Sequence, residues 1–74
     1  MTIDEFMQDI APKMRLGWVA MDDNFRWSWF CDKPKLDKSH KIWYGSESWG
    51  FLDCYDISPV DDWTQSLRKV GYDD

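Results

Sequence analysis

Residues 17–31, with the sequence GWVAMDDNFRWSWFC, decide the fold. On both sides of the polar run at residues 22–24, side chains of different character alternate with a period of two, which is typical of β-strands. Two strands separated by so short a gap pair most simply as an antiparallel hairpin. We therefore predict strands over residues 17–21 and 25–31, with Asn24 as a left-handed residue in the turn.

Two further strands are predicted after this hairpin. Residues 32–41 carry four lysines, a proline and the only histidine with little apolar content, so we expect a solvated loop. Residues 42–44 form a short aromatic strand, residues 45–50 a turn, and residues 51–55 alternate again. The four short strands are expected to form an antiparallel meander.

Sequence signals predict a helix near each end of the chain. Thr2 and Glu5 have the spacing of a capping box, and apolar residues follow at helical intervals until Pro12 ends the helix. Near the other end, Ser58 and the proline after it form a helix start, and Gly71 is a left-handed stop. The apolar edge of this second helix consists of Val60, Trp63, Leu67 and Val70.

The predicted fold class is α+β: a four-stranded antiparallel meander with an N-terminal and a C-terminal helix packed on one face. The 74 residues make a single domain, residues 1–74, in which residues 71–74 are expected to fray. Aromatic residues are 18% of the chain and fill much of a small core. Because no third layer is expected, the second sheet face leaves tryptophans partly exposed or meets a second copy in a homodimer.

The charge balance favours a basic partner. Nine Lys and Arg against 14 Asp and Glu leave a net charge of −5, which disfavours direct binding to nucleic acid. No stretch approaches the ~18 apolar residues of a membrane span, and the first residues do not resemble a signal peptide. We therefore expect a cytoplasmic protein without membrane attachment, in which Cys31 and Cys54 stay reduced.

No arrangement of residues predicts catalysis, a metal or a cofactor. The two cysteines and the histidine lack the paired spacing of metal ligands. Ser39 beside His40 suggests a nucleophile and a base, but adjacent side chains point apart in an extended chain. Asp53 and Asp56 have the residue type of a general acid and a general base, but their spacing is a signal of very low specificity for catalysis. We expect no catalytic residue, cofactor-binding residue or metal ligand.

The composition favours a binding function. Two simpler explanations stay open: the aromatic residues fill the core, and the acidic residues solvate the surface. Aromatic anchors with a rim of carboxylates suit a partner with a basic surface. The candidate contact residues are Trp27, Trp29, Trp43 and Trp49, with a rim of Asp53, Asp56, Asp61 and Asp62. The alternative is an aromatic pocket that binds a nucleotide or another small ligand.

Short motifs spread over residues 15–70: GWVAMD from Gly17, WSWF from Trp27, Lys33-Pro34, Trp43 and DWTQSL from Asp62. In these motifs the chain resembles small tryptophan-rich proteins encoded by bacteriophages and prophages. A glycine is common in those proteins at the position of Phe25, where it completes the hairpin turn. The resemblance implies a phage or mobile-element protein acting inside a bacterium, and it transfers no catalytic or ligand residue.

The sequence thus predicts a small acidic, non-catalytic binding protein of phage type. In the cytoplasm of the bacterium it would dock onto a host protein, such as a nucleic-acid-handling or defence enzyme, and inhibit it. A nucleotide-binding or small-ligand module is the alternative hypothesis. An enzyme is the third, and no residue pattern supports it.

Overall fold

The predicted hairpin lies at the centre of the molecule. The computed structural model describes residues 1–45 and 49–71, and in it strand β1 (Gly17–Met21) pairs antiparallel with strand β2 (Trp27–Phe30). Side chains alternate along both strands as predicted. One face of this hairpin carries Val19, Met21, Trp27 and Trp29.

The hairpin turn differs from the prediction at one residue. Phe25 donates its backbone N–H to the Asp22 carbonyl at 3.0 Å, and Phe25, not Asn24, is the left-handed residue, with φ 69°. Asn24 instead accepts the N–H of Arg26 on its side-chain oxygen at 3.0 Å. The loop is therefore a turn followed by one left-handed residue, and this last position is normally glycine.

Four strands form the main sheet, but they do not form a meander. The strand order is β5 (Trp49–Phe51), β2, β1 and β6 (Arg68–Val70), with antiparallel pairing throughout. The strand predicted over residues 51–55 thus lies two residues earlier, and a 3-10 helix, η2 (Asp53–Tyr55), follows it. The outer strand β6 lies where the C-terminal helix is predicted.

The lysine-rich segment predicted as a solvated loop contains a strand. β3 (Lys35–Asp37) pairs antiparallel with β4 (Ile42–Tyr44) to form a separate two-stranded sheet. Leu36, opposite Trp43, is the single apolar side chain of β3, so the sequence offers no alternation to detect. The turn predicted over residues 45–50 falls partly outside the described residues, and its last two residues belong to β5.

The N-terminal helix is confirmed. α1 (Ile3–Asp9) begins with the predicted capping box, in which Glu5 N–H donates to Thr2 Oγ1 at 3.1 Å and Thr2 N–H donates to Glu5 Oε1 at 3.0 Å. A 3-10 helix, η1 (Ala11–Lys13), follows and contains the proline that stops α1. The core between α1 and the main sheet consists of Ile3, Phe6, Ala11, Val19, Met21, Trp27, Leu52, Ile57 and Val70.

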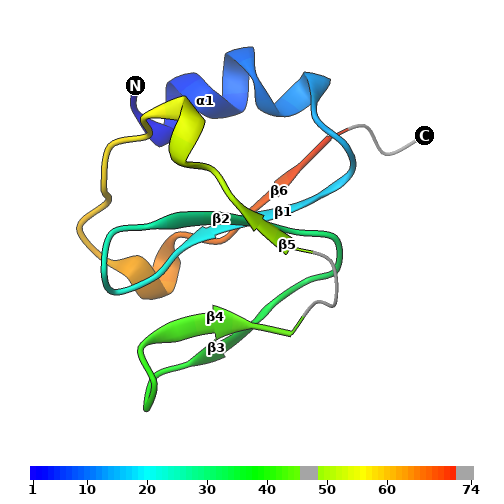
Figure 1. Cartoon of the computed structure of the whole chain (residues 1–74). Coiled ribbons are helices and arrows are strands. Elements are labelled where there is room, and N and C mark those ends of the chain that lie inside the picture. Colours follow the sequence, from blue (N-terminus) through cyan, green and yellow to red (C-terminus); the bar gives the residue numbers. More distant parts are fainter. Residues whose placement is uncertain (46–48, 72–74) are drawn as a thin grey trace.

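The second face of the main sheet is covered as well. Ala20, Phe30 and Trp43 form a second buried cluster, and the side chains that pack against it include Trp18, Leu36, Trp63 and Leu67. Figure 1 shows α1 on one side of the main sheet and the β3–β4 hairpin on the other. The third layer is therefore a hairpin, and the prediction of two helices on one face with the other face open is wrong.

The predicted C-terminal helix is absent from the described residues, which between residues 58 and 67 include only the 3-10 helix η3 (Trp63–Gln65). Asp62 uses its carboxylate locally and accepts both the N–H and the hydroxyl of Thr64. Ser66 is fully buried, and its Oγ accepts the Met21 N–H at 2.8 Å. These tertiary contacts override the helix signals, because propensity is a weak determinant of local structure.

Gly71 adopts the predicted left-handed conformation, with φ 87°, but it follows a strand rather than a helix. Its N–H donates to the carbonyl of Ala11 at 2.9 Å, which joins the end of β6 to η1. The other residues predicted to fray, 72–74, lie outside the described residues. In the described part of the chain, no helix has the length and apolar character needed to cross a membrane.

Candidate functional site

Exposed large hydrophobic side chains gather beside the edge strand β5. Ile42 and Tyr44 of β4 are 39% and 48% exposed, and Trp49 and Phe51 of β5 are 54% and 45% exposed. They line a groove of about 320 Å³, here named the aromatic groove, together with Asp22, Ser28, Phe30, Trp43 and Gly45. Single exposed hydrophobic residues are ordinary, whereas several around one hollow indicate an interaction site.

Strand β5 positions two of these rings. Trp49 lies opposite Phe30 and Phe51 opposite Ser28, so both rings project from the sheet face that the β3–β4 hairpin covers. The two rings meet edge to face, with centroids 4.9 Å apart. Among the described residues no further strand pairs with the outer side of β5. The groove therefore lies along a sheet edge, where a partner chain can approach.

A half-buried carboxylate lines the same groove. Asp22 directly follows β1, and its Oδ1 accepts the backbone N–H of Trp43 at 2.8 Å, which ties β4 to the end of β1. Burial raises the pKa of Asp22 above its usual 3.8, and the hydrogen bond from Trp43 offsets part of this rise. The groove thus contains a negative charge that its surroundings disfavour.

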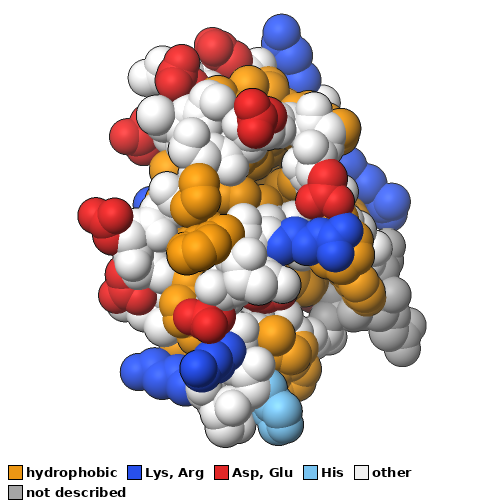
Figure 2. All heavy atoms as spheres, turned by 60° about the vertical axis from the view of Figure 1, so that its left-hand side comes forward, with side chains coloured by type: hydrophobic (Ala, Val, Ile, Leu, Met, Phe, Trp, Pro, Cys, Tyr) orange, Lys and Arg blue, Asp and Glu red, His pale blue; other side chains and the backbone are white. Residues whose placement is uncertain are grey.

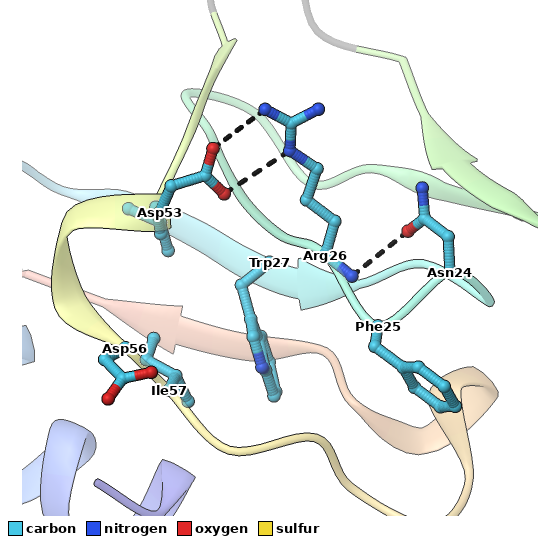
Figure 3. A pocket seen from close by; sticks show the side chains of 8 residues that line it. Asn24, Phe25, Arg26, Trp27, Asp53, Asp56 and Ile57 are labelled. Carbon is cyan, nitrogen blue, oxygen red and sulfur yellow. Dashed lines mark hydrogen bonds and ion pairs between the residues drawn. The ribbon is translucent and has the colours of Figure 1, made fainter.

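A second hollow lies at the hairpin turn (Figure 3). This turn pocket, of about 400 Å³, is lined by Asn24, Phe25, Arg26, Trp27, Leu52, Asp53, Asp56 and Ile57. Arg26 donates from Nε and Nη2 to the Asp53 carboxylate at 3.3 and 2.8 Å. The Arg26 guanidinium also lies over the Phe51 ring, 3.4 Å from its centroid. Arg26 therefore connects the turn pocket to the aromatic groove.

The turn pocket includes two residues with an unusual backbone conformation. Phe25 and Asp56 have φ values of 69° and 50°, a region that costs an L-residue free energy that glycine would not lose. Phe25 is 63% exposed, so core packing does not explain its presence there. Strained residues are frequent at binding sites, although Lys41, with φ 60°, lies in the β3–β4 turn and lines neither hollow.

The four predicted tryptophans divide between core and surface. Trp27 and Trp43 are only 4% and 9% exposed, and Trp29 is half-buried, so these three rings mainly pack in or against the core. The indole N–H groups of Trp27 and Trp29 are buried and have no hydrogen-bond partner among the described residues, which is a cost that the packing of their rings must outweigh. Trp49 is the most exposed member of the set, and Trp29 lines a third hollow of about 400 Å³ on the other side of β5.

The four predicted acids are all exposed, but only two line a hollow. Asp53 and Asp56 belong to the turn pocket, and the hydrogen bonds from Arg26 lower the pKa of Asp53, which favours its charged form. Asp61 and Asp62 line neither hollow, and Asp62 caps η3. Figure 2 shows hydrophobic side chains exposed between acidic ones on one face of the molecule.

The β3–β4 turn brings Ser39 and His40 together, contrary to the prediction that they point apart: Ser39 Oγ lies 3.3 Å from His40 Nδ1. Asp37 accepts the Ser39 hydroxyl at 2.7 Å and lies 2.7 Å from the same His40 nitrogen. The Ser39 hydroxyl, and next His40, lower the pKa of Asp37 to about 2. In a catalytic relay, one imidazole nitrogen contacts the nucleophile and the other contacts the carboxylate. Here Ser39 and Asp37 both contact His40 Nδ1, so the three residues cap the turn instead.

Four residues of the site have weak sequence signals. Asp22 reads as part of a polar turn, although its place directly after a strand was a sign that it lies at the sheet end. Arg26 and Tyr44 carry no distinct signal. Phe51 is two residues from Trp49 with glycine between them, a spacing that places two rings on one face of a strand.

No protein-family model, curated protein or solved structure matches this chain. The resemblance to phage-encoded tryptophan-rich proteins stays a prediction. Cys31 and Cys54 form no disulfide, and the described residues hold no group of three or more His, Cys, Asp or Glu side chains suited to a metal ion.

Proposed function

We propose that this chain is a non-catalytic binding module that docks onto a basic segment of a protein partner through the aromatic groove and the turn pocket. The observation that carries the proposal is the gathering of four exposed hydrophobic side chains, Ile42, Tyr44, Trp49 and Phe51, around one groove. Exposed apolar surface of this kind marks interaction sites, and aromatic anchors dominate interface energetics.

Charge complementarity favours a basic partner. The net charge is −5, and Asp22 lines the aromatic groove and Asp56 the turn pocket, where Asp53 is already paired with Arg26. A basic segment gains long-range attraction and local counter-charges, whereas the phosphates of nucleic acid would be repelled. If the phage resemblance holds, the partner is a cytoplasmic protein of the bacterial host, such as a nucleic-acid-handling or defence enzyme that the docking inhibits.

A nucleotide or another small ligand is the second candidate. Five aromatic rings line the groove and offer stacking surfaces for a base. The carboxylate of Asp22 in the same groove opposes a phosphate, so we rank this candidate below a basic protein segment. Quenching of tryptophan fluorescence by a panel of nucleotides, without any protein partner, would reverse the order.

Photo-crosslinking tests the proposal at the residue level. A photoreactive phenylalanine derivative replaces Trp49 in one variant and Leu16 in a second; Leu16 is 44% exposed and lines neither hollow. We expect crosslinks in bacterial lysate at position 49 and not at position 16, to a basic segment identified by mass spectrometry.

The purified partner then provides the quantitative test. Phe51→Ala should weaken its affinity by about tenfold or more, as for an interface hot spot, and Leu16→Ala should leave it unchanged. Equal crosslinking at both positions would contradict the proposal. Crosslinking of position 49 to a second copy of the chain would instead identify the groove as a homodimer interface.

A further inference from the structure

We infer that the aromatic groove receives an arginine side chain of the partner, with Asp22 as the counter-charge. This inference rests on the proposed function and names the chemical group that the groove recognises. The rings that line the groove are those of Phe30, Trp43, Tyr44, Trp49 and Phe51. A cation within about 6 Å of an aromatic ring face is attracted by the ring quadrupole, and more strongly where water is excluded.

Asp22 provides the charge that such a cation requires. Its Oδ1 accepts the Trp43 N–H, and no side chain or backbone group of the described residues donates to its Oδ2. A carboxylate accepts about four hydrogen bonds, so this one retains capacity for a donor from a partner. The half-buried carboxylate and the aromatic rings line the same groove. A cation entering the groove would offset the cost of burying Asp22.

Arginine suits this lining better than lysine. The guanidinium is planar, weakly hydrated, stacks on aromatic faces and presents several N–H donors, whereas an ammonium holds its water strongly. The chain already uses this chemistry next to the groove, where Arg26 lies over Phe51 and donates twice to Asp53. Phe51 also lines the groove, and Arg26 does not. The groove offers a second guanidinium the same two elements, an aromatic wall and a carboxylate.

A pair of blocked amino acids tests the inference directly. N-acetyl-arginine methylamide and its citrulline analogue have nearly the same shape and differ in charge. They are titrated into the isotope-labelled full chain while the indole N–H signals of Trp43 and Trp49 are followed by NMR. We expect the arginine compound to bind and the citrulline compound to bind at least about tenfold more weakly, because a charge-assisted hydrogen bond is lost.

Two matched variants locate the counter-charge. Asp22→Asn keeps an oxygen for the Trp43 N–H and should reduce arginine binding to the level of citrulline. Asp23→Asn removes the same charge one residue away, at an exposed position outside the groove, and should change binding by less than about twofold. Thermal unfolding of both variants shows whether a loss of binding reflects a loss of folding.

Several outcomes would overturn the inference: equal binding of arginine and citrulline, tighter binding of blocked lysine or trimethyllysine, full binding by Asp22→Asn, or no binding of arginine by the natural chain. The proposed function fails separately. If the arginine compound does not bind but Phe51→Ala still weakens the purified partner, the groove is a docking site that recognises another group. If arginine binds and no protein partner depends on Phe51, the groove is a small-cation site.

Discussion

At the scale of single residues, Asp22 combines a cost to stability with the role in binding that we propose for it. Burial raises its pKa above 3.8, so the folded chain holds this proton more tightly than the unfolded chain. The stability that the protonated Asp22 carboxyl contributes is therefore lost as pH rises from 3.8 through the pKa of Asp22 in the folded chain. We predict that the gain in unfolding free energy from Asp22→Asn grows as pH rises above 3.8 and levels off once the carboxyl of the folded chain is ionised. Urea unfolding at several pH values measures it.

Asp37 is the control with the opposite sign. Its pKa is lowered to about 2, so its charge contributes stability that is complete above 3.8 and is lost as pH falls toward 2. Asp37→Asn should therefore destabilise the protein near neutral pH and have less effect in acid. A pH profile of Asp22→Asn that runs parallel to that of Asp37→Asn would contradict the burial of Asp22.

Phe25 carries backbone strain that its exposed ring does not explain. The left-handed conformation costs an L-residue about 1–2 kcal/mol relative to glycine. A glycine offsets about 0.4–1 kcal/mol of this gain, because it has more conformational freedom in the unfolded chain. We predict that Phe25→Gly stabilises the protein by roughly 0.5 kcal/mol or more in urea unfolding. Asn24→Gly is the neighbouring control and should destabilise, because it removes the acceptor of the Arg26 N–H. A loss of stability in Phe25→Gly would mean that the ring packs in the turn pocket.

At the scale of elements, the segment before β6 is fixed by one buried hydroxyl. Ser66 Oγ accepts the Met21 N–H at 2.8 Å and lies 2.7 Å from the Trp63 carbonyl, to which it can donate. Ser66→Ala leaves the Met21 N–H buried without a partner and should cost about 1–3 kcal/mol. Gln65→Ala, at an exposed neighbour, should stay within about 0.5 kcal/mol. Equal effects in urea unfolding would show that the hydroxyl does not fix the segment.

Elements held by local signals could be predicted from the sequence, and elements held by distant contacts could not. The capping box of Thr2 and the alternation on both sides of the turn act within a few residues, so α1 and the β1–β2 hairpin are confirmed. Ser58 gives an equally local helix-start signal, but no α-helix follows it in the described part of the chain. The contact of Ser66 with Met21, 45 positions away, decides against a helix there, and no local pattern reveals it.

The candidate site follows the same rule. The sequence predicts exposed acids such as Asp53 and Asp56, but it does not separate the exposed Trp49 from the buried Trp27 and Trp43. Asp22 gains its role from Trp43, 21 positions away, and this contact exists only because the β3–β4 hairpin covers the second sheet face. The site could therefore be predicted where single side chains define it, and not where two layers meet.

At the scale of the whole molecule, the described residues form three layers that cover most of both faces of the main sheet. α1 covers one face of the main sheet and the β3–β4 hairpin the other (Figure 1). The exposed hydrophobic side chains beside β5 lie where the hairpin layer and the edge of the sheet meet. We therefore expect a partner to bind at the sheet edge and the groove. The remaining acidic residues contribute only long-range electrostatic attraction.

This division of roles predicts different kinetics for two acids that carry the same charge. Asp56 lines the turn pocket and Asp61 lines neither hollow. Asp61→Asn should slow association with the purified basic partner by about twofold at low ionic strength, an effect that screening removes in high salt, and should leave dissociation unchanged. Asp56→Asn, which suits a left-handed backbone, should slow association equally and also speed dissociation several-fold, because a contact is lost. Stopped-flow measurements at several salt concentrations separate the two rates. Faster dissociation of the Asp61 variant would place that acid in the interface and extend the docking surface beyond the two hollows.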